Sequence, residues 1–353
     1  MTGTHNSFMW RCLQLAKLGE GLVAPNPIVG AVLVHEGRII GEGYHREYGK
    51  AHAEVNCLNA VLPEDRHLIP SSTLYVSLEP CAHFGKTPPC ADLVIREQIP
   101  RVVVGCRDPF EAVNGKGIEK LKAAGLEVIA GFLERECIAA NARFFTFHQK
   151  KRPYIILKWA QSRDGCIAGP GKTRVNISNE LTNRLVHRWR AEESAIMVAS
   201  NTVQADNPSL TVRHWKGKHP VRILLDKKLA VKESFAIFSG EAPTIVYHEQ
   251  ENALPAYGER VLLQPGSGII GQILADQYQR GIQSILVEGG TILLQSFLDA
   301  GLWDEARVIT NLGLVLPGGY PGPRLTPEAQ LFSEQVLMKD QIQVFLHKNQ
   351  ADN

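Results

Sequence analysis

Short apolar segments alternate with helical stretches along this chain, and this alternation constrains its fold more than any other feature. An amphipathic helix within residues 1–20 precedes a predicted β-hairpin of residues 28–34 and 38–43. Predicted helices at 52–61, 91–98 and 117–124 then alternate with predicted strands at 73–78, 101–105 and 126–130. Strands that alternate with helices predict a layered α/β domain.

A polar, basic segment interrupts this alternation. Residues 147–153 read Phe-His-Gln-Lys-Lys-Arg-Pro, which predicts a solvated linker rather than a nucleic-acid-binding patch. Beyond it, predicted strands at 154–159, 195–199, 221–226, 244–247 and 284–288 accompany predicted helices at 179–190, 271–280 and 291–300. Since 353 residues exceed one typical hydrophobic core, we expect two α/β domains, residues 1–149 and 150–353.

The composition narrows the class of protein. The net charge of +2 gives no electrostatic footprint for a nucleic acid, and no apolar run is long enough to span a bilayer. Seven cysteines, an odd number in a long chain, do not indicate a disulfide framework. We therefore expect a cytoplasmic protein without nucleic-acid or membrane partners, whose thiols stay reduced.

Metal-ligand residue types occur in a specific order in the first half. His52 and Glu54 lie at the start of a predicted helix, Cys81 follows a predicted strand, and Cys90 precedes the next helix. One histidine and two cysteines suit zinc, and three protein ligands leave a fourth position for a water made acidic by the metal. Glu54, which is not a ligand, would carry the proton from that water to a leaving nitrogen. The order predicts a catalytic zinc site, with a closed structural zinc as the alternative.

The position of His52 decides whether this site can form. Residues two apart lie on opposite sides of a regular helix, so His52 and Glu54 can share a site only if His52 lies at the irregular helix N-terminus. Helix N-termini near the two cysteines favour the thiolate form that binds metal. We interpret the remaining cysteines as core residues: Cys12, Cys57, Cys106, Cys137 and Cys166.

The His-x-Glu and Pro-Cys pattern resembles the cytidine-deaminase-like superfamily, although eight residues rather than two separate the cysteines. Three further motifs closely resemble the bifunctional riboflavin-biosynthesis deaminase/reductase family: Pro-Asn-Pro-Ile-Val-Gly at 25–30, Gly-Glu-Gly-Tyr-His at 41–45, and Leu-Glu-Pro-Cys at 78–81 with the loop at 82–89. The resemblance implies a cytidine-deaminase-like three-layer domain whose loop holds a phosphoribosylated pyrimidine, with Asn26 near the ring. Asn26 could instead be a turn residue, and Lys86 could touch phosphate or face solvent.

A second group of polar residues lies in the second half. Lys158 is near a strand end, Arg190 ends a helix, and Thr202 precedes the motif Ala-Asp-Asn-Pro-Ser-Leu-Thr-Val-Arg at 205–213. A predicted strand then runs through Glu288 into Gly-Gly-Thr at 289–291, an arrangement that suits an anion but also serves as a tight connection. Gly266, Gly268 and Gly271 match a dinucleotide-binding spacing, but Pro265 breaks the strand-to-helix join, so we predict a loop.

From residue 152 to about residue 304 the chain resembles the reductase domain of the same family, which has a dihydrofolate-reductase-like α/β fold. The resemblance places Lys158 and Glu288 at the ribose as catalytic residues. It implies substrate contacts by Arg190, Leu210, Arg213 and Glu288, and NADPH contacts by Ala160, Thr202, Asp206, Gly289, Gly290 and Thr291. The alternatives are a surface ion pair for each arginine and a cap or turn role for Asp206.

Some residues depart from the family pattern. Arg163, Arg174, Asn176 and Asn207 stand where leucine, serine, tryptophan and aspartate are usual, which puts the details of NADPH binding in question. Beyond about residue 311 the resemblance is loose.

The resemblance implies two reactions and a homo-oligomer formed through the reductase domain. The first is zinc-dependent hydrolytic deamination of diaminohydroxyphosphoribosylaminopyrimidine, and the second is NADPH-dependent reduction of its ribosyl group to ribityl. A nucleic-acid deaminase, a reductase with an inactive deaminase half, and a non-enzymatic binding protein are the alternatives. The near-neutral charge and the second domain argue against the first of these, and the complete ligand set with Glu54 argues against the other two.

Overall fold

The computed structural model describes residues 2–84, 88–111, 113–251, 258–266 and 268–348. The chain divides into two compact units, Met1–Lys150 and Lys151–Asn353, which are described separately. Lys86, with Gly85 and Thr87 of the predicted substrate loop, lies outside the described residues. None of the helices in the described ranges has the length and apolar character needed to cross a membrane.

The first unit is built on a five-stranded sheet of order β2-β1-β3-β4-β5. Strand β1 is antiparallel to β2 and β3, and β3, β4 and β5 are parallel. The strands are β1 Gly30–His35, β2 Arg38–Tyr44, β3 Thr73–Leu78, β4 Arg101–Cys106 and β5 Glu127–Ala130. The helices are α1 Thr2–Ala16, η1 Lys17–Gly19, α2 Ala53–Asn59, η2 Pro63–Ser71, α3 Cys90–Arg96, α4 Lys116–Ala123, α5 Glu134–Ala140 and α6 Ala142–Lys150.

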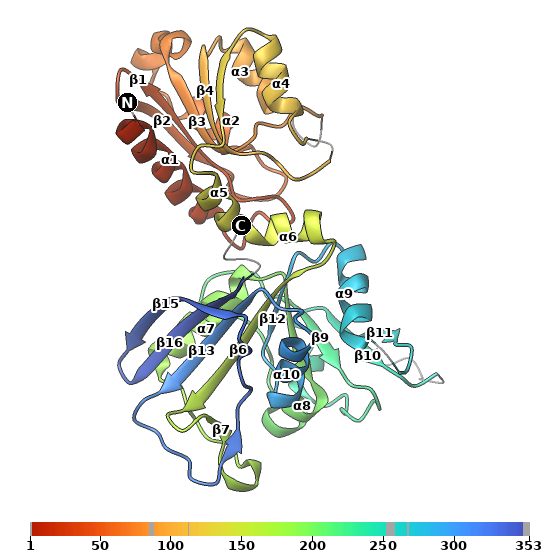
Figure 1. Ribbon diagram of the computed structural model, residues 1–353. Helices are drawn as coiled ribbons and strands as arrows, with labels where there is room; N and C mark the ends of the chain where they lie inside the picture. The colour runs from red at the N-terminus through yellow and green to blue at the C-terminus, as the bar shows by residue number, and fades with distance from the viewer. Residues whose placement is uncertain (1, 85–87, 112, 252–257, 267, 349–353) are drawn as a thin grey trace. The chain divides into compact units, whose positions relative to one another are not determined.

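Helices cover both faces of this sheet (Figure 1). On one face Val32 packs in a core with Met9 of α1, a core that α5 and α6 also join. On the other face Leu33 packs in a core with Leu58 of α2 and Val94 of α3. Because neighbouring strand residues point to opposite faces, a strand with consecutive apolar residues, such as Ala31–Val34 of β1, can fill both cores. The predicted three-layer α/β fold is confirmed.

The second unit contains a nine-stranded sheet of order β11-β10-β9-β8-β12-β6-β13-β16-β15, and β7 pairs with β14 beside it. The strands are β6 Tyr154–Ser162, β7 Cys166–Ala168, β8 Ala195–Ala199, β9 Val221–Leu225, β10 Thr244–His248, β11 Glu259–Leu262, β12 Ser284–Val287, β13 Glu305–Asn311, β14 Tyr320–Pro321, β15 Ala329–Leu337 and β16 Asp340–His347. The helices are η3 Pro170–Lys172, α7 Glu180–Glu192, α8 Ser200–Asp206, η4 Ala236–Phe238, α9 Ile269–Gln279 and α10 Thr291–Asp299.

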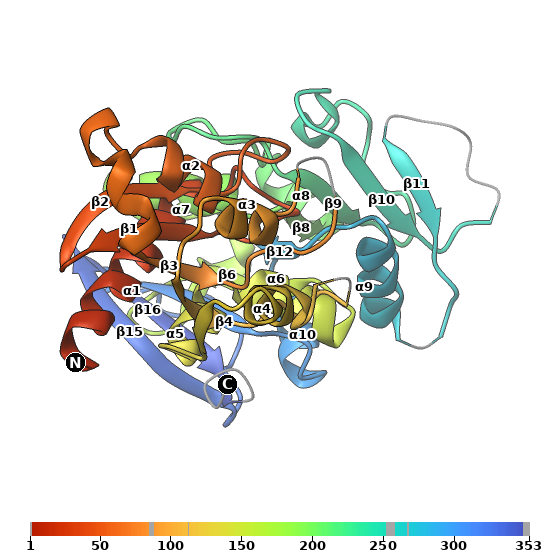
Figure 2. The ribbon, with the colours of Figure 1, turned by 90° about the horizontal axis from the view of Figure 1, so that it is seen from above.

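The second sheet is also covered on both faces. Val287 of β12 packs in a core with Phe297 of α10 and Ile273 of α9. On the opposite face the guanidinium of Arg307 lies 4.8 Å from the ring centre of Trp189, which places α7 there. Figure 2 shows β9, β10 and β11 side by side with α9 near them. Strands β11 to β13 in the sheet order are parallel, so the segments that follow β6, β8 and β12 meet at one edge.

Two predictions about local structure are wrong. Residues 147–150 are not a linker but the last turn of α6, whose Phe144 and Phe145 are buried and hold the helix on the sheet. Cys166 is not a core residue, because it lies half-buried in the short strand β7. Gly266 and Gly268 lie before α9, and Gly271 lies in its first turn, in agreement with the predicted helix at 271–280.

Candidate functional sites

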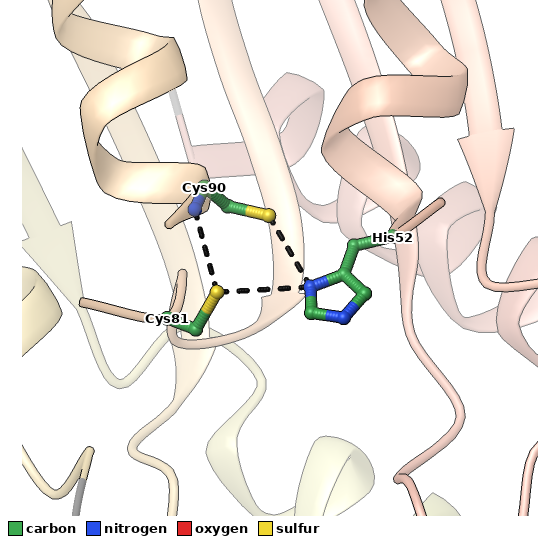
Figure 3. A group of neighbouring side chains, drawn as sticks. All are labelled: His52, Cys81 and Cys90. Carbon is green, nitrogen blue, oxygen red and sulfur yellow. Dashed lines mark hydrogen bonds between the residues drawn. The ribbon is translucent and has the colours of Figure 1, made fainter. Parts of the chain in front are cut away.

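The three expected metal ligands meet in the first unit. One nitrogen of His52 and the sulfur atoms of Cys81 and Cys90 all lie within 4.8 Å of one another. His52 Nδ1 is 3.6 Å from the sulfur of Cys81 and 3.3 Å from that of Cys90 (Figure 3). A nitrogen and two sulfurs at this spacing fit a tetrahedral zinc ion with one open position.

Local backbone structure explains why these residues can meet. His52 is the N-cap of α2 and has extended backbone angles, so its side chain and that of Glu54 are not forced to opposite sides of the helix. The expectation that His52 lies at an irregular helix start is confirmed. Cys90 opens α3, and its backbone N–H donates to the sulfur of Cys81 at 3.3 Å. The hydrogen bond between the two cysteine side chains, together with that from His52, lowers the pKa of Cys81 and favours its ligating thiolate. The same bond and burial raise the pKa of Cys90, so the expected thiolate character holds for Cys81 and not for Cys90.

Glu54 is the acidic group beside this cluster. It lies in the first turn of α2 and is only 3% exposed. Burial raises the pKa of Glu54 to about 7. A cation held by the neighbouring ligands would oppose that shift, because an opposite charge favours the ionised form.

Asn26 and His45 form a polar pair next to His52. The Nδ2 atom of Asn26 lies 3.0 Å from Nε2 of His45, and Nδ1 of His45 lies 3.1 Å from the carbonyl of Ala51. Only a protonated Nδ1 can bond a carbonyl, so Nε2 of a neutral His45 accepts from Asn26. The His45 and His52 rings are 5.3 Å apart, which places the pair beside the ligand cluster. The backbone N–H of Asn26 donates to the carbonyl of Val23 and closes a turn. Asn26 is therefore also a turn residue, which was the alternative interpretation.

Sequence reasoning missed the role of Glu79, although it quoted the motif that contains this residue. The Glu79 carboxylate is 4% exposed and accepts hydrogen bonds from four backbone N–H groups. These donors belong to Asp108, Gly115, Gly117 and Ile118, which lead into or start α4. A Cβ on Gly117 would lie 1.9 Å from the carbonyl oxygen of Pro80, so the two backbones are in direct contact. Glu79 thus anchors the segment that carries Cys81.

A cavity of about 610 Å³ in the second unit collects most of the other predicted residues. Its walls come from β6, α7, α8 and the segments that follow β12 and α8. The predicted residues that line it are Lys158, Ala160, Arg190, Thr202, Asp206, Leu210, Arg213, Glu288, Gly289 and Gly290. Thr291 is not part of this lining, because its hydroxyl donates to the carbonyl of Pro321 at 2.6 Å.

Glu288 is held by two buried cations. Arg190 donates to both carboxylate oxygens, at 2.9 and 2.8 Å, and Lys158 Nζ lies 3.6 Å from Oε2. Burial would raise the pKa of Glu288, but the charges of Arg190 and Lys158 outweigh it and hold that pKa well below its usual range. Burial lowers the pKa of Lys158. The alternative of a surface ion pair for Arg190 is wrong, since both partners are largely buried.

The wall of the cavity formed by α8 and the glycine turn has a different polar arrangement. The backbone N–H of Gly290 donates to the hydroxyl of Thr202 at 3.0 Å, which connects the glycine turn to α8. Asp206, the last residue of α8, pairs with Arg174 at 3.4 Å. One departure from the family pattern, Arg174, therefore forms an exposed ion pair with a residue that the resemblance assigns to NADPH.

His187 is a cavity residue that the sequence did not reveal. Its Nδ1 accepts the backbone N–H of Arg213 at 3.0 Å. Burial, together with the charges of Arg190 and Arg213, lowers the pKa of His187 to about 4. At physiological pH His187 is therefore neutral, and its unprotonated Nδ1 can accept this hydrogen bond. The doubly protonated imidazolium form has a hydrogen on Nδ1 and cannot accept it.

Comparisons with known proteins identify the family of each half of the chain. The RibD C-terminal domain family matches residues 153–343, and the cytidine and deoxycytidylate deaminase zinc-binding region matches residues 2–106. The Riboflavin biosynthesis protein RibD of Aquifex aeolicus is 44% identical over 86% of this chain and 85% of its own length. The protein of the same name from Bacillus amyloliquefaciens is 38% identical over 90% of this chain and 86% of its own.

Solved structures give the same result. The crystal structure of a diaminohydroxyphosphoribosylaminopyrimidine deaminase/5-amino-6-(5-phosphoribosylamino)uracil reductase from Thermotoga maritima has a TM-score of 0.87 and 37% identity. The similarity covers 98% of this chain and 99% of that one. Acinetobacter baumannii RibD has a TM-score of 0.87 and 30% identity, with the same coverage. The similarity extends through the region after residue 311 where the sequence resemblance was loose.

Proposed function

This chain belongs to the RibD family, and we propose that it catalyses two successive steps of riboflavin biosynthesis. In the first, diaminohydroxyphosphoribosylaminopyrimidine loses its ring amino group by zinc-dependent hydrolysis. In the second, the ribosyl group is reduced to ribityl with NADPH. We assign deamination to residues 1–149 and reduction to residues 150–353, and the division of the chain near Lys150 supports this assignment.

The observation that carries the deaminase assignment is the convergence of His52, Cys81 and Cys90 beside a buried carboxylate. We propose these three residues as zinc ligands. Zinc held there would supply an acidified water close to the ring carbon that bears the amino group. Glu54 would take a proton from that water and give it to the departing nitrogen, the general acid–base role of a carboxyl group buried beside the ligands.

Asn26 is proposed as a ring-binding residue of the same site. His45 fixes the orientation of the Asn26 amide, because Nε2 of His45 accepts from Nδ2. The amide oxygen is then the atom that Asn26 offers to a donor on the pyrimidine. A fixed amide of this kind distinguishes a substrate donor from an acceptor at that position.

At the reductase site, Glu288 could either transfer a proton or hold a hydroxyl of the sugar, and its contacts with Arg190 and Lys158 favour the second role. With its pKa held low by Arg190 and Lys158, Glu288 stays ionised at neutral pH and is not a proton donor. We propose that it accepts a hydrogen bond from a ribose hydroxyl, and that Lys158 donates to the sugar. NADPH would supply the hydride.

Binding of the rest of the substrate and of NADPH follows from the cavity walls. We propose Arg190, Leu210 and Arg213 for the phosphorylated substrate, with Arg213 the more exposed of the two cations. The proposed NADPH contacts are Ala160, Thr202, Asp206, Gly289, Gly290 and Thr291. Because Thr291 bonds Pro321, its hydroxyl would have to change partner to reach the cofactor.

We also propose a homo-oligomer formed through the reductase domain, in the cytoplasm. Strand β15 lies at the end of the sheet order, and Leu331, Phe332 and Val336 are at least half exposed along it. An apolar edge strand is a typical site for pairing with another chain. All seven cysteines are unpaired, which suits a reducing compartment. Sedimentation of the purified protein, compared with that of a Phe332→Lys variant, tests the oligomer.

The proposed function is tested by incubating the purified protein with the diaminopyrimidine substrate, with and without NADPH, and following the product mass. We expect the amino-to-oxo change without NADPH and a further gain of two hydrogens with it. If only the first change occurs, the reductase assignment is wrong, and the departures from the family pattern at Arg174 and Asn176 are the first candidates for the loss of NADPH binding. Absence of both changes would contradict the proposed function as a whole.

A further inference from the structure

One wall of the reductase cavity has no regular structure of its own. Residues 207–213, here called the pocket segment, contain neither helix nor strand, yet they bring Ser209, Leu210 and Arg213 to the cavity. Asn207 and Leu210 have left-handed backbone angles, with φ of 43° and 56°. A segment with such angles keeps its shape only if its surroundings hold it.

A buried arginine reaches this segment from the sheet. Arg222 of β9 is fully buried, and its Nη1 donates to the carbonyl of Ser209 at 3.3 Å. The same guanidinium has four further acceptors: Thr244 Oγ1, the carbonyl of Ala236, Ser239 Oγ and the carbonyl of Ala242. It therefore joins the pocket segment to two strands and to the loop around η4.

The chemistry of these acceptors distinguishes Arg222 from an ion-pair residue. All five are neutral oxygens, and two-pronged pairing with a carboxylate is absent from its hydrogen bonds in the described chain. A buried charge is costly unless hydrogen bonds satisfy it, and a planar guanidinium with five donors can fix several backbone groups at once. Asn207 adds a second tie, because its Oδ1 accepts from the backbone N–H of Ala236 at 2.7 Å.

We propose that Arg222 is a positioning residue of the reductase: it holds the pocket segment so that Leu210 and Arg213 face the phosphorylated pyrimidine. The proposal rests on the proposed reductase function. Arg222 itself does not line the cavity. Loss of Arg222 should therefore weaken binding of the pyrimidine more than binding of NADPH, because the proposed NADPH contacts lie on β6, α8 and the glycine turn.

The test is steady-state kinetics of the reductase reaction in the full-length Arg222→Met variant, with the deaminated pyrimidine as substrate. We expect the KM for the pyrimidine to rise about tenfold, the effect of losing one charge-assisted hydrogen bond. The KM for NADPH should stay within about twofold of its starting value, and the deaminase rate should not change. Arg222→Lys keeps a cation with fewer donors and should give a smaller rise. A pyrimidine KM within twofold of the parent value, or an equal rise in both KM values, would overturn the proposal.

Tyr247→Phe is the matched control for a general loosening of the sheet. Tyr247 is a fully buried residue of β10, the strand next to β9, and its hydroxyl bonds Asp276 and Gln277 rather than the pocket segment. We expect a lower melting temperature with an unchanged pyrimidine KM. If this variant raises the pyrimidine KM as Arg222→Met does, the effect is general and the proposal is wrong.

Asn207→Gly provides an independent variant if Arg222→Met does not fold. Glycine accepts the left-handed backbone of this position, so the change removes the side-chain tie to Ala236 and the amide that Asn207 presents to the cavity, without straining the backbone. We expect a rise of about threefold in the pyrimidine KM, since one neutral hydrogen bond is removed. Folded Asn207→Gly and Arg222→Lys proteins with unchanged pyrimidine KM would refute the proposal. Failure of the proposed function is distinguished on the parent protein, which would then neither deaminate its substrate nor reduce the deaminated pyrimidine at any NADPH concentration.

Discussion

Replacement of Glu79 by glutamine should weaken zinc binding although Glu79 is not one of the proposed ligands. Its carboxylate accepts four backbone N–H groups, from Asp108 and Gly115 at one oxygen and from Gly117 and Ile118 at the other. Glutamine keeps one oxygen and presents an NH2 group in place of the second. Two bonds are then lost, and a donor faces two donors in a buried site.

The magnitude follows from these contacts. Hydrogen bonds to a charged group contribute about 1.5 kcal/mol or more each, so losing two costs about 3 kcal/mol. The loss occurs two residues from Cys81, where the backbone of Pro80 touches that of Gly117. Since metal binding and folding of a metal site are coupled, up to about 3 kcal/mol reaches the zinc equilibrium. This corresponds to about a hundredfold weaker zinc binding.

Chelator competition on the purified protein measures that affinity, and the absorption spectrum of the cobalt-substituted protein reports the ligand geometry. Reductase activity of the same sample provides an internal control, because it belongs to the other unit. Glu127→Gln is a matched variant: this carboxylate forms an exposed pair with Arg101, so its loss should cost about 0.5 kcal/mol or less. Zinc affinity within threefold of the parent in Glu79→Gln, with an unchanged deaminase rate, would refute the reasoning.

Three further predictions concern the two sites directly. Glu54→Gln should retain zinc but lose deaminase activity by a factor of about 100 to 10,000, while the reductase rate stays constant; retained deamination in a zinc-loaded variant would exclude Glu54 as the proton carrier. Glu288→Gln should reduce the reductase rate and leave deamination intact, and an unchanged reductase rate would remove the proposed role in binding the ribose. His187 is neutral in the folded state because its pKa is lowered to about 4. The unfolded chain therefore binds the proton first, and the free energy of unfolding should fall as the pH drops from about 6.5 toward 4. His187→Asn keeps an acceptor for Arg213 N–H, so urea unfolding at pH 7 and 4.5 should show a smaller difference for this variant; an equal difference would contradict the assignment to His187.

Most elements of the fold could be predicted because their apolar residues form short runs, as in buried strands, or recur at helical spacing. Strand β3, which is buried on both faces, was predicted to the residue, and α2 and α3 to within about two residues at either end. The missed elements lack such a pattern. Strand β15 is exposed at most positions, and α6 ends in the basic residues that suggested a linker. Packing of Phe144 and Phe145 against the sheet, rather than local composition, extends α6.

The sequence alone predicted the chemistry available to this protein: the zinc-ligand set with Glu54, the family, and ten of the residues that line the cavity of the second unit. These features could be predicted because they depend on residue type and spacing, both of which can be read from the sequence. Tertiary structure decided how the groups are held and in which charge state. Arg190 lies 98 positions from Glu288, and Glu79 lies 29 to 39 positions from its donors, so no local pattern reveals either contact. The ionised state of Glu288 and the fixed position of Cys81 arise only when folding removes water and brings these distant partners together.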